Sequence, residues 1–156
     1  MLNNDLSQQI KRNFPYKPTE EQENAVKSFA EFLFSPSADS VFLMKGYAGT
    51  GKTTLTSALV RTLDSLQRKV ILLAPTGRAA KVFSGYAEHP AYTIHKKIYR
   101  QKVFSNETDN FVANQNLHRN TLFIVDEASM IANEGLSGGH FGSGRLLDDL
   151  VQYVYN

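Results

Sequence analysis

The chain contains no cysteine, no long hydrophobic run and little net charge. Without cysteine it has no disulfides or thiolate metal sites, which is typical of a reducing compartment. No apolar run approaches the roughly 20 residues of a membrane-spanning helix, and the polar start lacks the apolar centre of a secretory signal. The net charge of +2 gives no general attraction to nucleic acid. We therefore expect a cytoplasmic protein without a membrane partner, whose nucleic-acid contacts, if any, depend on local groups.

Residues 46–53 have the sequence GYAGTGKT, which fits the phosphate-binding loop G-x-x-x-x-G-K-[ST] of nucleoside triphosphatases. The glycines allow backbone conformations closed to other residues, so that successive N–H groups can surround an anion. We expect Lys52 to reach the β- and γ-phosphates of ATP and the Thr53 hydroxyl to ligate Mg²⁺. The predicted nucleotide contacts of this loop are Gly46, Ala48, Gly49, Thr50, Gly51, Lys52, Thr53 and Thr54.

The surroundings of this loop favour the phosphate-binding interpretation over a glycine-rich turn with an incidental lysine. Residues 40–44 are apolar and predict a buried strand before the loop. After it, leucine and alanine recur at helical spacing over about residues 52–67. A strand, a glycine loop and a helix in that order form the setting that phosphate binding needs.

Further elements follow from the same kind of pattern. Thr19 and Gln22 form a capping box that opens a helix, preceded by a polar arm over residues 1–18. Continuous apolar runs at 69–74 and 121–125 predict strands of a parallel sheet covered on both faces. We expect short helices at about 78–85 and 94–99, a hairpin within 100–118, a mobile glycine-rich loop at 135–144 and an amphipathic helix over 145–156.

Asp126 and Glu127 end the apolar run 121–125 and predict the second half of the nucleotide site. An aspartate at the carboxyl end of a strand can hold Mg²⁺, usually through water, because hard cations prefer oxygen ligands. The adjacent glutamate can orient and deprotonate an attacking water, which makes Lys52 and Glu127 the predicted catalytic pair. The alternative is an acidic helix start favoured by the helix dipole.

Taken in order, these motifs resemble superfamily 1 DNA helicases, specifically the RecD-like and Dda-like class that moves 5′ to 3′. The resemblance covers about residues 19–130. It adds Gln22, in TEEQ, as an adenine contact. The stretch LAPTGRAAK at 73–81 is similar to the motif that touches single-stranded DNA, and TIH at 93–95 to the next DNA-contact motif. The implied DNA contacts are Pro75, Thr76, Gly77, Arg78, Lys81, Thr93 and His95.

Each of these residues also has a plainer explanation. Gln22 and Thr93 are good helix-capping residues, residues 76–78 can simply turn the chain into a helix, and His95 can be a partly buried ring. The cations near residue 100 can form a solvated face, or can suit strand binding together with interleaved rings. The residues concerned are Lys96, Lys97, Arg100, Lys102, Tyr99 and Phe104.

The resemblance implies an α/β P-loop fold with a RecA-like, mostly parallel sheet and helices on both faces. It also implies that residues 19–156 are an incomplete first motor domain, with 97–118 as a small inserted strand-separating subdomain. The family's next motif, its central strand, its transition-state arginines and its second motor domain have no counterpart here. We therefore expect a fragment whose unpaired strand edges invite a partner strand, strand exchange or a dimer.

Three hypotheses of function follow. The first is the ATP-binding part of an ATP-dependent DNA helicase or translocase that uses ATP and Mg²⁺ to move on single-stranded DNA; the resemblance implies a role in DNA repair or recombination. The second is a nucleotide- and strand-binding module that does not unwind on its own. The third is another P-loop ATPase, such as an AAA-type motor, which would leave residues 76–81 and 93–95 unexplained. The sequence leaves the choice between DNA and RNA open.

Overall fold

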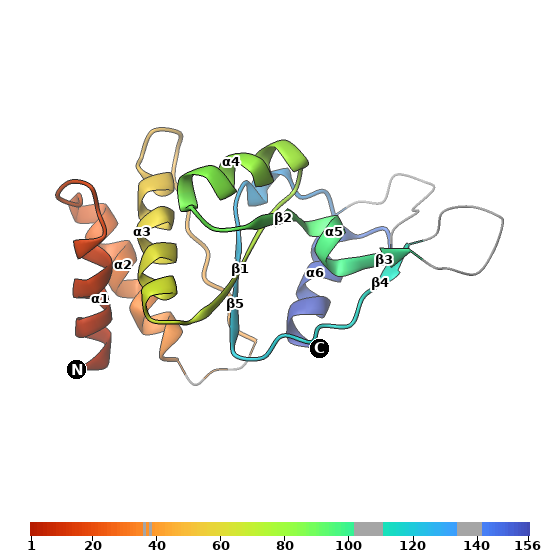
Figure 1. Cartoon of the computed structure of the whole chain (residues 1–156), viewed down its shortest axis with the longest axis horizontal. Helices are drawn as coiled ribbons and strands as arrows, with labels where there is room; N and C mark the ends of the chain where they lie inside the picture. Colours follow the sequence, from red (N-terminus) through yellow and green to blue (C-terminus); the bar gives the residue numbers. More distant parts are fainter. Residues whose placement is uncertain (36, 38, 102–110, 134–141) are drawn as a thin grey trace. The chain divides into compact units, whose positions relative to one another are not determined.

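The computed structural model describes residues 1–35, 37, 39–101, 111–133 and 142–156 (Figure 1). The chain divides into two compact units, each built around its own elements. The first consists of Met1–Arg68 with Tyr86–Glu88, and the second of Lys69–Gly85 with His89–Asn156. The phosphate-loop sequence belongs to the first unit, and the acidic pair belongs to the second.

Three helices make up most of the first unit: α1 (Leu2–Arg12), α2 (Glu20–Leu33) and α3 (Lys52–Ser65). α1 packs against both α2 and α3. The unit's core is apolar and comes from all three helices, through residues that include Leu6, Ile10, Val26, Phe29, Ala30, Leu55, Ala58, Leu59 and Leu63. The capping box predicted at the start of α2 is confirmed, because Thr19 and Gln22 exchange both of its hydrogen bonds.

The expected N-terminal arm is helical over α1 and packs into the first unit. Its polar composition hides three apolar residues at helical spacing, Leu6, Ile10 and Phe14, which are all buried. Asn13, just past the helix, donates to Thr62 Oγ1 over 2.8 Å. Thr62 is itself fully buried and donates to the Ala58 carbonyl. The end of α1 is therefore fastened to α3 by a part-buried polar pair as well as by apolar packing.

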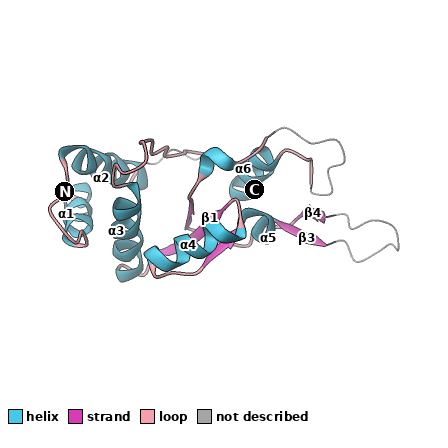
Figure 2. Cartoon of the chain, turned by 90° about the horizontal axis from the view of Figure 1, so that it is seen from above, coloured by secondary structure: helices cyan, strands magenta, loops and turns pink. Residues whose placement is uncertain are grey.

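The second unit contains a parallel sheet in the order β2–β1–β5. Figure 2 draws the strands in magenta and labels β1. β1 (Lys69–Ala74) pairs with β5 (Thr121–Val125) from Lys69↔Thr121 to Leu73↔Val125. On its other side β1 pairs with the short β2 (Ala91–Thr93). The unit's helical elements are α4 (Gly77–Ala87, whose last two residues belong to the first unit), α5 (Ile94–Ile98), the 3-10 turn η1 (Ala128–Met130) and α6 (Leu146–Tyr155).

Both faces of β1 are buried, as its continuous apolar run predicts. Ile71 and Leu73 join a cluster with α5 and α6 that includes Ile94, Ile98, Tyr99, Leu150 and Tyr153. The alternate residues Val70, Leu72 and Ala74 are also buried. A strand covered on both faces is the mark of an α/β layer structure. The predicted class, a parallel sheet flanked by helices, is confirmed.

A separate two-stranded ribbon follows α5. β3 (Tyr99–Gln101) pairs antiparallel with β4 (Phe111–Ala113), with Tyr99 opposite Ala113. This confirms the predicted strand pairing within 100–118, while residues 102–110, which include Lys102 and Phe104, lie outside the described residues. Most of the predicted glycine-rich loop, residues 134–141, lies outside them as well.

One predicted element is wrong. Residues 40–44 form no strand, and Val41 and Leu43 are largely exposed rather than buried. Only one side of the segment packs, through Phe42, whose ring lies 5.6 Å from the rings of Phe29 and Phe32. A strand needs a hydrogen-bonded neighbour, and the described residues provide none for this segment. An apolar run indicates that a segment can be buried, but it does not show that a neighbouring strand is available to pair with it.

Candidate nucleotide and nucleic-acid sites

The phosphate-loop sequence forms a tight, exposed turn ahead of α3. Gly49 and Gly51 have φ angles of +79° and +85°, in the left-handed region that favours glycine. Gly46 is held closely as well, because a Cβ there would lie 2.7 Å from Thr50 Oγ1. The Thr50 amide and hydroxyl both donate to the Tyr47 carbonyl, at 3.3 and 2.7 Å. Each glycine of the motif is thus required by the geometry.

Lys52 lies inside this turn. Its Nζ donates to the Gly46 carbonyl and, over 3.3 Å, to the Tyr47 carbonyl. The loop therefore folds around one ammonium group. The positive charge of Lys52 therefore lies within the loop, and its contact with the phosphates of a nucleotide stays a prediction.

The start of α3 fits an anion. The N-cap residue of α3 is Gly51, which has no side chain to cap the helix. The N–H groups of the first turn then have no helical partner, and the helix dipole adds positive potential at the same place. Thr53 is exposed in this first turn, so its hydroxyl is accessible to a metal ion. The residues present therefore fit a triphosphate, with Thr53 as one oxygen ligand of its Mg²⁺.

Two side chains from outside the motif fasten the loop to the helices. Gln22, only 5% exposed, donates through Nε2 to the Gly51 carbonyl over 3.1 Å. Its Oε1 accepts from the Thr19 amide over 2.9 Å. Tyr16 and Thr54 share a hydrogen bond of 3.1 Å between their hydroxyl oxygens. Gln22 is thus both a capping residue and a support of the loop, and its predicted adenine contact remains a prediction.

In the second unit, Asp126 and Glu127 lie where β5 ends. The Asp126 amide donates to the Leu73 carbonyl of β1 over 3.0 Å, so the residue extends the sheet pairing. Its Oδ1 accepts from the Glu127 amide over 2.9 Å. Glu127 has a φ of +53°, turns the chain into η1 and is exposed. Asp126 is thus fixed at the end of the strand, and Glu127 is exposed at the turn that follows it.

The acidic pair shares a hollow with two predicted strand-contact residues. The hollow has a volume of about 290 Å³ and is lined by Thr76, Arg78, Ala79, Val82, Asp126, Glu127 and Met130. Thr76 caps α4, since its Oγ1 accepts from the Ala79 amide over 3.2 Å. The two groups meet because β1 and β5 are neighbours and parallel, so that the loops after them emerge on one side.

The remaining predicted DNA contacts lie on the same unit. Gly77 and Lys81 are exposed on α4, and Pro75 is half-buried at the end of β1. Thr93 caps α5 by accepting from the Lys96 amide over 3.1 Å. The His95 ring lies 5.7 Å from the Tyr99 ring, and burial lowers the pKa of His95. The capping explanation of Thr93 is therefore correct, residues 76–78 do lead the chain into α4, and strand contact stays a prediction for Thr76 and Thr93.

The structure alters the proposed stacking surface around residue 100. Tyr99 is only 6% exposed and belongs to the core, so its ring is unavailable for stacking with a base. Tyr92, which sequence reasoning missed, is more exposed, and Lys97 Nζ lies 5.3 Å from its ring centroid. A ring paired with a cation suits nucleic acid better than a buried one.

A positive region also surrounds His118. Burial, together with the positive charges of Lys97 and Lys69, lowers the pKa of His118.

Within the part of the chain that the structure describes, no three His, Cys, Asp or Glu side chains are grouped to hold a metal ion. In the same residues, no helix is both long and apolar enough to span a membrane.

Comparison with known proteins places these sites in a family. The AAA domain family model matches residues 17–138, which span the loop, the sheet and the acidic pair. The chain is 37% identical over 90 residues to the ATP-dependent DNA helicase dda of Enterobacteria phage T4, covering 56% of this chain and 20% of that protein. It is 32% identical over 107 residues to the multifunctional conjugation protein TraI of Escherichia coli K12, covering 64% and 6%.

A third relative is the uncharacterized protein MJ1519 of Methanocaldococcus jannaschii, 28% identical over 139 residues, or 82% of this chain and 11% of that protein. The chain thus spans only a small part of the curated relatives it matches. These similarities are helicase-like rather than specific to the RecD-like class. Because the family model covers well over half of the chain and includes its phosphate loop, the chain belongs to the AAA domain family, with a helicase-like P-loop fold.

Proposed function

We propose that the chain is the ATP-binding part of a DNA helicase or translocase of the RecD-like and Dda-like class, moving 5′ to 3′ on single-stranded DNA. The observation that supports this most is the shared hollow of the second unit, where Asp126 and Glu127 lie beside Thr76 and Arg78. A motor must couple hydrolysis to strand contact. Groups suited to each task occur here on one edge of one sheet.

Each unit contributes its own part of the nucleotide role. In the first unit, Lys52 and the first-turn amides of α3 would bind the β- and γ-phosphates, and Thr53 would offer an oxygen ligand to magnesium. In the second unit, Asp126 would be the magnesium ligand. Glu127 orients the attacking water and takes its proton. When bound, Mg·ATP supplies the free energy of its terminal phosphate bond. Gln22, Ala48, Gly49, Thr50 and Thr54 complete the proposed nucleotide contacts.

The strand role rests on the second unit. Thr76, Gly77 and the first turn of α4 offer donors to a backbone phosphate, and Arg78 and Lys81 add charge. Pro75, Thr93 and His95 extend this surface along the sheet edge. The β3–β4 ribbon within residues 97–118 is the proposed strand-separating insertion.

Stimulation of ATP hydrolysis by single-stranded DNA in the full-length protein tests this proposal. We expect added strand to raise turnover, and Lys52→Ala to abolish it, because the phosphates lose their ammonium group. Lys45→Ala, at an exposed lysine just ahead of the loop, serves as the matched control and keeps wild-type turnover. Normal turnover in Lys52→Ala would refute the assignment.

Two other functions compete with this one. An AAA-type ATPase of another kind is favoured by the family name itself, and unchanged turnover with single-stranded DNA would support it. A module that binds nucleotide and strand without unwinding is the third candidate. A transition-state arginine contributes about 10³–10⁵ in rate, and none is assigned within this chain. We therefore expect these 156 residues alone to hydrolyse ATP slowly and to unwind nothing.

A further inference from the structure

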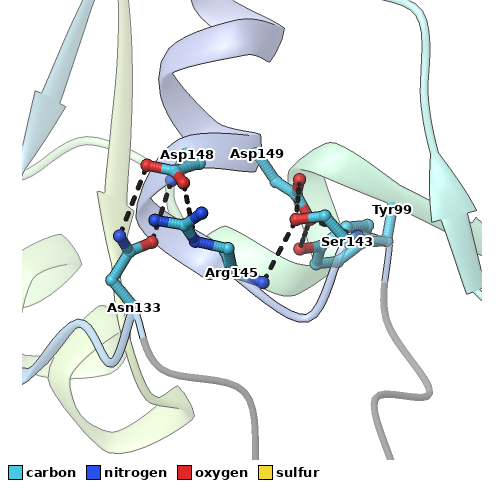
Figure 3. A network of polar contacts seen from close by, with 6 residues as sticks. All are labelled: Tyr99, Asn133, Ser143, Arg145, Asp148 and Asp149. Atoms are coloured by element: carbon cyan, nitrogen blue, oxygen red, sulfur yellow. Dashed lines mark hydrogen bonds and ion pairs between the residues drawn. The ribbon is translucent and has the colours of Figure 1, made fainter.

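A buried carboxylate at the start of α6 receives three hydrogen bonds (Figure 3). Tyr99 donates its hydroxyl to Asp149 Oδ2 over 2.6 Å. The Ser143 amide donates to the same oxygen over 3.0 Å, and the Ser143 hydroxyl donates to Oδ1 over 2.6 Å. Asp149 and Tyr99 are 7% and 6% exposed. A charged acceptor with several short bonds of this kind makes a strong and directional contact.

Tyr99 is the first residue of β3, so this contact fixes one strand of the ribbon. The second strand is fixed next to it. The Gly142 amide, one residue ahead of Ser143, donates to the Phe111 carbonyl of β4 over 2.9 Å. A Cβ on Gly142 would lie 2.6 Å from Tyr99 Cε1 and would collide with Asp149 Oδ2. Residues 142–143 thus lie in direct contact with the Tyr99 ring and the Asp149 carboxylate.

Further contacts fasten the same end of the ribbon. The Asn114 amide, just past β4, donates to the Ile98 carbonyl over 2.6 Å. Asn116 donates to the Val154 carbonyl of α6 over 3.2 Å. The Tyr99 ring packs with Leu150 and Tyr153 of α6. Both strands are therefore attached at their base to α6 or to the residues that lead into it.

The neighbouring carboxylate forms a separate network (Figure 3). Asp148 Oδ1 accepts from Asn133 over 3.3 Å, and its Oδ2 pairs with Arg145 Nε at 2.9 Å. This network is exposed and contains no residue of β3 or β4. Two adjacent acids of one helix therefore have different partners, and only Asp149 contacts the ribbon.

We propose that Asp149 and Tyr99 are positioning residues that clamp the base of the β3–β4 ribbon to α6 and so set how the ribbon meets the nucleic-acid strand. This inference rests on the proposed function. A strand-separating element must resist the duplex, because a ribbon that swings freely lets the motor advance without opening base pairs. The hydroxyl and the carboxylate fix the angle of the ribbon, while the apolar ring only holds it in contact.

The first experiment tests the clamp itself, by amide hydrogen exchange in the full-length protein. Tyr99→Phe keeps the ring in the core and removes only the hydroxyl. We expect exchange of the Gly142 amide to accelerate by about tenfold or more, while the β1 amides keep their rates. Asp149→Asn should act the same way, and Asp148→Asn should leave the Gly142 amide unchanged. An unchanged Gly142 rate in Tyr99→Phe would overturn the clamp.

The second experiment measures base pairs opened per ATP hydrolysed. Tyr99→Phe should keep strand-stimulated ATP turnover within about twofold and lose severalfold in opening per ATP, and adding Asp149→Asn should cause little further loss. Asp148→Asn should open duplex normally. Undiminished opening per ATP in Tyr99→Phe would sink the inference and leave the proposed function standing. Absence of strand-stimulated turnover in the unaltered protein would instead defeat the proposed function, and the positioning role with it.

Discussion

The side-chain amide of Gln22 donates to the carbonyl of Gly51, joining the first turn of α2 to the residue from which α3 starts. The contact is 3.1 Å long and part-buried, and the same side-chain amide caps α2 by accepting from the Thr19 amide. One side chain thus fixes where a helix begins and how the phosphate loop ends. Each of these contacts depends on the other, since both use one amide plane.

Replacing Gln22 by alanine should weaken both contacts together. We expect Gln22→Ala to lower the free energy of unfolding by about 1–3 kcal/mol, because a cap is lost and the part-buried Gly51 carbonyl loses its donor. Nucleotide affinity should also fall. Urea denaturation and nucleotide titration measure the two effects, and Gln9→Ala, at a residue on α1 whose side chain bonds Asp5, is the control. Wild-type stability in Gln22→Ala would contradict the expectation.

Two glycine-to-alanine changes should have opposite signs. Gly51→Ala places a Cβ against Gln22 Nε2 at a φ of +85°, so we expect a loss of about 1–3 kcal/mol in unfolding free energy. Gly85→Ala adds a Cβ within α4 that meets nothing within 4 Å. It should stabilise the chain by roughly 0.5–1 kcal/mol through helix propensity. The denaturation midpoints of the two variants, each compared with wild type, measure these effects. Equal shifts would contradict the inference that the loop needs glycine at position 51.

Glu127→Gln should separate hydrolysis from binding. Glutamine keeps the size of the side chain but cannot accept the proton of water, so we expect turnover to fall by about 10²–10⁴-fold. Under the proposed function the loop of the first unit binds the phosphates, so nucleotide affinity should stay close to wild type. Glu31→Gln, at an exposed glutamate on α2, is the matched control. Retained turnover in Glu127→Gln would assign the base elsewhere.

The Asp149 carboxylate should make the free energy of unfolding depend on pH in the acidic range. Burial would raise the pKa of Asp149, but the hydrogen bonds from Ser143 and Tyr99 outweigh it and lower the pKa below its usual 3.8. The contribution of Asp149 to the free energy of unfolding is therefore fully present above its ordinary pKa of 3.8. It is lost as the pH falls through the lowered pKa of the folded state. Urea midpoints measured from about pH 6 down to about pH 2 should decline less steeply in Asp149→Asn than in wild type. Parallel curves would contradict the assignment.

Local patterns in the sequence predicted most elements of the fold. The capping box of Thr19, the C-terminal helix and the glycine loop depend on interactions within a few residues of the chain. Such features can be inferred because the interaction that forms them is written in adjacent positions. The strand 69–74 could be predicted from its continuous apolar run, although the strands that pair with it lie far away in the sequence.

Features that depend on distant partners were harder to predict. The segment 40–44 has the composition of a strand, but pairing requires a neighbour that composition cannot show. α1 was missed because three buried apolar residues are dispersed among polar ones. The Asp149 carboxylate is 50 residues from Tyr99, and no motif joins them. For α1, the spacing of Leu6, Ile10 and Phe14 was a signal that could have been used.

The backbone of Glu127 is held in a conformation that suits asparagine or glycine better than glutamate. Under the proposed role, this position keeps glutamate for its chemistry although its backbone conformation is strained for that residue. A laboratory selection for heat resistance alone would favour asparagine or glycine here, since either relieves the twist. The selected variants would be more stable but would hydrolyse ATP poorly. Their appearance would show that stability and catalysis make opposite demands on a single residue.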